Sequence, residues 1–226
     1  QIIEKYDLVA LPVVDSIGRL VGQITVDDVM DEIREQSERD YQLASGLSQD
    51  VETDDKVFRQ TSARLPWLLI GMLGGIGNSM ILGNFHTTFV THPEMALYIP
   101  LIGGTGGNVG TQSSAIVVQG LANSSLDAKD TLKQVAKEAV VASINATIIS
   151  LLVYIYNLIR FGATATVTYS VSISLFAVVM FASIFGTLVP MTLEKLKIDP
   201  AIATGPFIAI TNDIIGMMLY MGITVL

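Results

Sequence analysis

Long apolar segments dominate the sequence after residue 64. Five of them lie at about 65–84, 95–121, 138–159, 170–193 and 206–226. An α-helix rises about 1.5 Å per residue, so each segment is long enough to cross the ~30 Å hydrocarbon core of a bilayer. Half of all residues are hydrophobic and only 15% are charged. The sequence therefore predicts an all-α polytopic membrane protein with five transmembrane helices, embedded in a lipid bilayer.

Basic residues in the short connecting segments predict the orientation of these helices. One side of the membrane would hold three groups of cations, and the other side would hold Arg160. The three groups are Lys56, Arg59 and Arg64; Lys129, Lys133 and Lys137; and Lys195 and Lys197. Because positive charge marks the cytoplasmic side, we expect a cytoplasmic N-terminus and an external C-terminus.

The first 60 residues form an acidic, polar head. They contain 14 Asp and Glu residues against 6 Lys and Arg residues. The stretches "LPVVD" and "LVGQIT" are typical of two strands joined at Gly18, and an acidic helix is predicted from Val26 to about Leu47. Such a head repels nucleic acid and can attract cations, although a solvated helix face is the more frequent explanation.

One carboxylate, Asp213, lies in the middle of the fifth apolar segment. A central aspartate costs about 2.5–3.5 kcal/mol on insertion scales, so it normally faces a bundle interior or a water-filled path. Ala209 and Gly216 share its helical face, and Thr211 and Asn212 precede it. Asp213 is therefore a candidate functional site, with a structural carboxylate hydrogen-bonded inside the bundle as the alternative.

The second apolar segment is rich in glycine. Five glycines fall within residues 103–110, followed by Thr111 and Gln112, with Asn108 among them. Because glycine weakens a helix by about 1 kcal/mol relative to alanine, the pattern predicts a broken helix or a very close backbone approach. Packing of small residues between helices is the alternative explanation. A phosphate-binding loop is disfavoured because its lysine is missing.

The residues favour ion permeation over enzymatic chemistry. The two histidines, His86 and His92, fall in an external loop, and the other carboxylates within the spans are expected only at the span ends. Acid–base catalysis in the membrane would require a second group near Asp213. The absence of cysteine excludes a thiolate metal site. We therefore expect no enzyme.

A two-fold dimer would bring two Asp213 side chains to a shared axis. Mg²⁺ keeps several of its waters and is commonly held by one or two carboxylates, so such a site suits it, with Mn²⁺ and Co²⁺ left open. Two alternatives remain at this point. One is a proton- or sodium-coupled divalent cation exporter, and the other is a membrane-anchored sensor without transport.

Two segments, "YIPLIGGTGGNVGTQSS" and "DPAIATGPFIAITNDIIGMMLYM", resemble the signature segments of the MgtE family of magnesium channels. The resemblance implies a homodimeric pore in a bacterial inner membrane, normally gated by cytoplasmic Mg²⁺, with Asp213 as the pore carboxylate that holds hydrated Mg²⁺. Thr111 stands where an asparagine is more usual. The pore-lining residues implied are Asn108, Thr111, Gln112, Ala209, Asn212 and Gly216.

The head resembles the end of a CBS module over residues 1–33, a truncated α/β remnant followed by a plug helix and linker over 34–64 and a channel domain over 65–226. The resemblance implies regulatory Mg²⁺ contacts at Asp31 and Asp40, while Gln36 and Arg39 replace frequent glutamates. We expect Gln1 to mark an engineered or proteolytic start and Mg²⁺ to inhibit such a fragment poorly. Thr25 and Asp28 fit a nucleotide-ribose pattern of CBS modules, but a helix cap explains the same two residues without a ligand and is the favoured interpretation.

Overall fold

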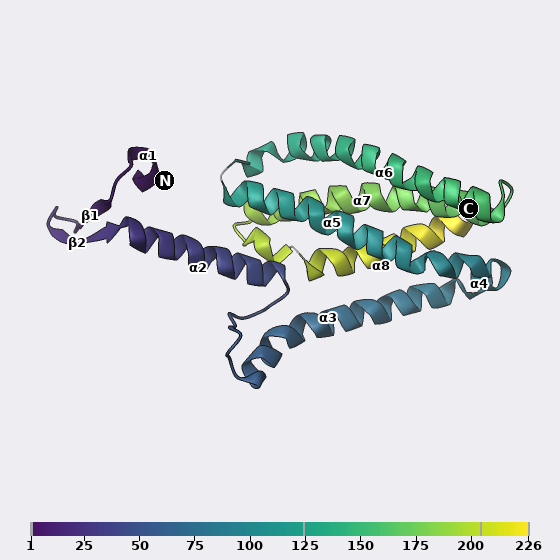
Figure 1. Cartoon of the computed structure of the whole chain (residues 1–226), viewed down its shortest axis with the longest axis horizontal. Coiled ribbons are helices and arrows are strands. Elements are labelled where there is room, and N and C mark those ends of the chain that lie inside the picture. The colour runs from purple at the N-terminus through teal and green to yellow at the C-terminus, as the bar shows by residue number, and fades with distance from the viewer. Residues whose placement is uncertain (1, 124, 204, 226) are drawn as a thin grey trace. The chain divides into compact units, whose positions relative to one another are not determined.

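The computed structural model of the chain is mostly helical and describes residues 2–123, 125–203 and 205–225 (Figure 1). The chain divides into two compact units, Gln1–Gln42 and Leu43–Leu226. The division falls near the end of the acidic helix α2 (Val26–Ala44).

The first unit is built on a β-hairpin. It contains α1 (Ile2–Tyr6), β1 (Ala10–Val14), β2 (Leu20–Thr25) and most of α2. The two strands are antiparallel, as the sequence predicts, with Ala10 paired to Thr25. Gly18 supplies the left-handed conformation of the turn with a φ of +81°.

Helix α2 begins with a capping arrangement. Thr25 donates to the Oδ2 atom of Asp28 from its hydroxyl at 2.6 Å and from its backbone N–H at 2.8 Å. The helix ends at Ala44, a few residues before the expected Leu47, and none of its side chains is buried. The acidic residues of α2 therefore lie on a solvated helix.

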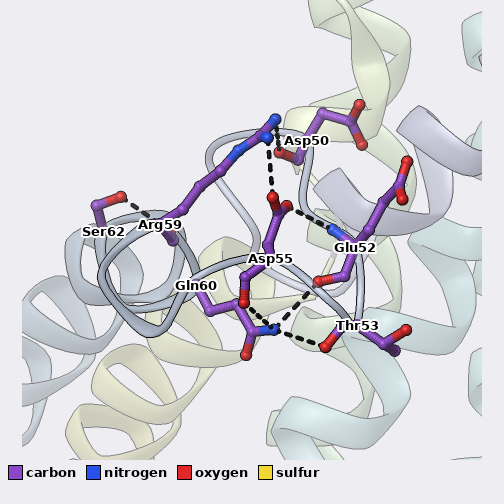
Figure 2. A network of polar contacts seen from close by, with 7 residues as sticks. All are labelled: Asp50, Glu52, Thr53, Asp55, Arg59, Gln60 and Ser62. Atoms are coloured by element: carbon purple, nitrogen blue, oxygen red, sulfur yellow. Dashed lines mark hydrogen bonds and ion pairs between the residues drawn. The ribbon is translucent and has the colours of Figure 1, made fainter.

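A loop joins α2 to α3 (Val57–Asn84), and it is held against the first turns of α3 (Figure 2). Arg59 forms a salt bridge with Asp55 at 2.9 Å and donates to the carbonyl of Asp50 at 3.1 Å. Gln60 Nε2 contacts three loop carbonyls at 3.1–3.3 Å, those of Glu52, Thr53 and Asp55. The loop is therefore ordered by side chains of the helix that follows it.

Among the described residues, four helices are long and apolar enough to cross a membrane: α3, α6 (Thr131–Phe161), α7 (Thr166–Lys195) and α8 (Pro206–Val225). Helix α5 (Ile99–Ala122) has 24 residues but does not reach that hydropathy, because glycines and amides replace apolar side chains. The connections contain four short helices, α4 (His86–Thr91), η1 (Pro93–Tyr98), η2 (Ala128–Asp130) and η3 (Pro200–Ala203).

Helix α7 lies at the centre of the second unit. It packs against α5, α6 and α8, while α3 packs against α8 (Figure 1). In the most apolar stretch of α7, 56% of the residues are buried, against 11% in α6 and 6% in α3. The outer helices expose large apolar side chains, among them Leu68, Leu73, Ile144 and Ile159. This distribution is typical of a bundle that faces lipid, as expected for an integral membrane protein.

The glycine-rich helix α5 is continuous, so the expected break is wrong and the expected close approach is confirmed. A Cβ atom added at Gly186 of α7 would lie 2.4 Å from the carbonyl oxygen of Gly110. At Gly106 it would lie 2.9 Å from Val178 Cγ1. Real Cβ atoms do not come this close to backbone or to a β-branched side chain, so glycine is required where α5 touches α7.

Candidate functional site

A cavity of about 400 Å³ lies between helices α3, α5 and α8. Most of its wall comes from one face of α5, and the rest comes from a few residues of α3 and α8. The lining residues are Asn78, Leu82, Ile99, Pro100, Gly103, Gly104, Gly107, Asn108, Thr111, Ala209, Asp213 and Met217.

Asp213 is the one carboxylate among these lining residues. It is partly buried and makes no hydrogen bond or salt bridge to any residue that the structure describes. Two glycines of α5 face it: a Cβ atom added at Gly103 or Gly107 would lie 3.4 or 3.5 Å from Asp213 Oδ1. The missing side chains leave room beside the carboxylate, so its oxygens remain free to bind a ligand from the cavity.

Four of the predicted pore residues meet in this cavity: Asn108, Thr111, Ala209 and Asp213. The hydroxyl of Thr111 donates to the carbonyl of Gly107 at 2.8 Å, so its oxygen keeps lone pairs that can accept a hydrogen bond. The Asn108 side chain is exposed and offers both a carbonyl oxygen and an amide. The cavity thus combines a carboxylate with neutral oxygens, the donor set that hard cations and their bound waters prefer.

The other three predicted pore residues lie elsewhere. Asn212 is 1% exposed and points to Gly110, where an added Cβ atom would lie 1.8 Å from its Nδ2 atom. Gly216 packs against Val178 of α7. Gln112 is exposed and does not line the cavity. Successive helical residues turn by 100°, so Asn212 and Gln112 face away from their neighbours Asp213 and Thr111.

Two polar residues of the membrane helices were missed in the sequence analysis. Asn78 of α3 lines the cavity, and it could have been noticed as an amide within an apolar run. Glu138 was assigned to the end of a span, but α6 begins seven residues earlier, and Glu138 is 8% exposed inside the helix bundle. Glu138 is the first residue of its predicted span, but its burial inside the bundle could not be predicted from that position.

The proposed regulatory residues of the head lie on the exposed surface of α2. Asp31 lies 3.7 Å from Arg34, and Asp40 accepts a hydrogen bond from Gln36 at 2.7 Å. The hydrogen bonds between Thr25 and Asp28 are those of a helix cap, and the Thr25 hydroxyl lowers the pKa of Asp28 below its usual value. The cap accounts for this pair without a nucleotide.

The histidines stand apart from the cavity. His86 begins α4, and His92 Nδ1 lies 3.3 Å from Glu94 Oε1. Within residues 2–123, 125–203 and 205–225, no three His, Cys, Asp or Glu side chains are grouped closely enough to hold a metal ion. Asp213 is therefore the one carboxylate that the described part of a single chain offers in the cavity, and any cation bound there would depend on water and neutral oxygens for its other ligands.

The fold and this cavity define a class: a helical membrane protein whose apolar bundle presents to a glycine-rich helix a carboxylate that has no ion-pair partner among the described residues. The chain belongs to the MgtE family, since the family model described as "Divalent cation transporter" matches residues 99–223.

Three curated relatives match 99% of the chain. The magnesium transporter MgtE of Bacillus subtilis (strain 168) is 34% identical over 223 residues. Its counterparts from Thermus thermophilus and Enterococcus faecalis are 32% and 31% identical over 229 residues. The match covers 49–50% of each relative, so the chain spans about half of their length.

Proposed function

We propose that this chain is the pore-forming part of a Mg²⁺ channel, which passes hydrated ions down their electrochemical gradient without an enzymatic reaction. The family description and the names of the three relatives support magnesium as the transported ion. In this proposal α5, which corresponds to the second apolar segment, also crosses the membrane, so that the chain has five spans in all. Its 24 residues would extend about 36 Å, which exceeds the hydrocarbon thickness.

The observation that carries the proposal is the unpartnered carboxylate of Asp213 in a cavity large enough for a hydrated ion. A water molecule occupies about 30 Å³ in the liquid, so six waters need about 180 Å³. The cavity of about 400 Å³ exceeds this volume. Mg²⁺ gives up its waters reluctantly, and a site that holds it through its hydration shell avoids that cost.

The lining residues have distinct roles in this mechanism. The negative charge of Asp213 attracts the cation and accepts hydrogen bonds from its waters. The Thr111 oxygen and the Asn108 amide can bind further waters, while Gly103 and Gly107 keep the space beside the carboxylate open. Anions are repelled by the carboxylate, and the apolar helices around the cavity strengthen this electrostatic effect.

A homodimer would complete the site. One carboxylate compensates only half of the charge of a divalent cation, whereas a two-fold axis beside the cavity would pair two Asp213 side chains. The basic residues near the helix ends favour a cytoplasmic N-terminus in a bacterial inner membrane. The acidic helix α2, with Asp31 and Asp40, would then bind cytoplasmic Mg²⁺ and gate the pore, and residues 1–33 would belong to a CBS module.

One observation favours the alternative function, a proton- or sodium-coupled exporter. Glu138 is a buried carboxylate in a membrane helix, and a coupled carrier can use such a group. Glu138 is not among the residues that line the cavity of Asp213. Imposed pH and Na⁺ gradients separate the two functions. A channel flux follows the Mg²⁺ gradient and membrane potential alone, whereas an exporter flux changes with the second gradient.

The proposal is tested by Mg²⁺ uptake into liposomes that contain the purified protein. The variants are Asp213→Ala and Asp213→Asn, with Asp130→Asn as a control at an exposed position. We expect the wild type and the control to conduct Mg²⁺, and both Asp213 variants to lose uptake or discrimination against Ca²⁺ while folding normally. Equal uptake by all four proteins would show that Asp213 has a structural role.

A further inference from the structure

A second polar cluster lies on the side of α5 away from the cavity. The Oε1 atom of Glu138 accepts hydrogen bonds from the hydroxyls of Ser113 and Ser183, each at 2.7 Å. The two hydroxyl oxygens are 3.0 Å apart. Glu138 belongs to α6, Ser113 to α5 and Ser183 to α7, so one carboxylate joins three helices.

All three side chains of this Glu138 cluster are buried. Glu138 is 8% exposed, Ser113 4% and Ser183 2%. A carboxylate shielded from water needs hydrogen-bond donors, and removing a donor leaves a buried acceptor unsatisfied. The cluster therefore favours the one arrangement of α5, α6 and α7 in which both hydroxyls reach Glu138.

The cluster lies one helical turn from the closest contact between α5 and α7. Gly110 precedes Ser113 by three residues, Gly186 follows Ser183 by three, and these two glycines touch through their backbones. Residues three apart lie on the same face of a helix. The hydrogen bonds thus act at the interface where α5 packs against α7.

The same helix carries the cavity wall on another face. Thr111 and Asn108 line the cavity, and at 100° per residue they are rotated by about 160° and 140° from Ser113. A shift of α5 along α7 would therefore move both residues relative to Asp213 of α8. At Gly110 the packing against Ile208 and Asn212 of α8 is tight, so such a shift would also disturb the contact between α5 and α8.

We propose that Glu138 is a positioning residue for the cation site. By accepting hydrogen bonds from Ser113 and Ser183, it fixes the position of α5 along the axis of α7, and this position places Asn108 and Thr111 beside Asp213. This inference rests on the proposed function and extends it. Glu138 touches neither the ion nor its waters, and it acts through the backbone of α5.

The test compares Glu138→Gln, Glu138→Leu and the double variant Ser113→Ala/Ser183→Ala in liposomes. Glutamine keeps a carbonyl oxygen that can accept from both serines, whereas leucine fills the space without an acceptor. An apolar residue of similar volume is often tolerated in place of a buried charge, so the leucine variant should fold. Glu194→Gln serves as the control, because Glu194 is exposed near the end of α7.

The readouts are the apparent Mg²⁺ affinity and the Mg²⁺/Ca²⁺ permeability ratio. The amount of folded protein in the liposomes is measured separately for each variant. We expect Glu138→Leu and the double serine variant to lower both about tenfold, the equivalent of one hydrogen bond to a charged group, and Glu138→Gln to stay near wild type. A uniform change in the amount of folded protein, with both quantities unchanged, would overturn the inference. So would a glutamine variant as impaired as the leucine variant.

Two further comparisons keep the result decisive. If Glu138→Leu does not fold, the single variants Ser113→Ala and Ser183→Ala each remove one hydrogen bond, and unchanged selectivity in both contradicts the inference. If the wild type itself does not conduct Mg²⁺, the proposed function fails first. Wild-type conduction with unchanged variants contradicts only the positioning role of Glu138.

Discussion

Ile210 of α8 projects directly onto Gly74 of α3. A Cβ atom added at Gly74 would lie 2.5 Å from Ile210 Cγ2 and 3.7 Å from Ile210 Cβ. Ile210 is β-branched and cannot rotate its methyl group away freely. The contact joins the first long helix to the helix that carries Asp213, three residues further on.

Replacing Gly74 by alanine should therefore loosen α3 from α8. We expect a loss of stability of about 1–3 kcal/mol from overpacking, measured by thermal unfolding in detergent. Gly75→Ala is the matched control, since its Cβ would meet nothing within 4 Å. Alanine is favoured over glycine in a helix, so the control should be neutral or more stable. Equal melting temperatures for the two variants would contradict a stabilising role for the contact between Gly74 and Ile210.

Gly103→Ala should weaken cation binding at Asp213. The added methyl group would lie 3.4 Å from Asp213 Oδ1 and 3.6 Å from Met217 Cε, within the space proposed for bound water. We expect Mg²⁺ affinity to fall by roughly tenfold, about 1.4 kcal/mol. At Gly104 nothing lies within 4 Å, so Gly104→Ala should have a smaller effect. A larger loss at Gly104 would place the ion elsewhere in the cavity.

The cap of α2 should make its N-terminus sensitive to acid. The hydroxyl of Thr25, followed by its backbone N–H, lowers the pKa of Asp28 from the ordinary 3.8. A lowered pKa in the folded state means that the stabilisation is fully present above pH 3.8 and is lost as the pH falls through the folded value.

Thr25→Val removes the hydroxyl donor and keeps the side-chain shape. We expect the pKa of Asp28 to rise toward its ordinary value and the acid sensitivity of the helix start to decrease, as followed by carbon NMR of the carboxyl group. Thr25→Ser keeps the donor and should retain the low pKa. An unchanged titration in the valine variant would rule out the hydroxyl as the main cause.

Gln60→Ala should release the loop between α2 and α3. Gln60 Nε2 contacts three loop carbonyls, and the partly exposed contacts together should contribute about 1–2 kcal/mol to local stability. Amide exchange and proteolysis of residues 50–56 should then accelerate about tenfold. In Ser62→Ala only a bond to the carbonyl of Arg59 is lost, so the loop should keep its protection.

The sequence predicted much of this architecture because apolar runs and lone polar residues are local signals. The hairpin, the acidic helix and four apolar helices occur where they were expected. The helices extend beyond the apolar spans: α3 begins at Val57 and α6 at Thr131, since polar residues such as Lys133 can continue a helix outside the bilayer. The burial of Glu138 could not be predicted, because it depends on how α6 packs against α5 and α7.

Which residues face the cavity could be predicted only in part. Asp213 and the glycine-rich segment stand out by composition, and the structure brings Asn108 and Thr111 beside Asp213. Asn212 and Gly216 could not be assigned because a helix that is apolar on all sides gives no periodic signal for the face that meets each neighbour. Their directions depend on the packing of α8 against α5 and α7.

Because the helices are buried to different extents, their positions should tolerate substitutions to different extents. On the exposed faces of α3 and α6 a residue needs only to be apolar, so leucine, isoleucine and valine are interchangeable there. The buried positions of α7 instead pack against neighbouring helices, and the buried serines and glycine among them fit fixed spaces. Neutral drift should therefore be fast around the rim of the bundle and slow along its central helix.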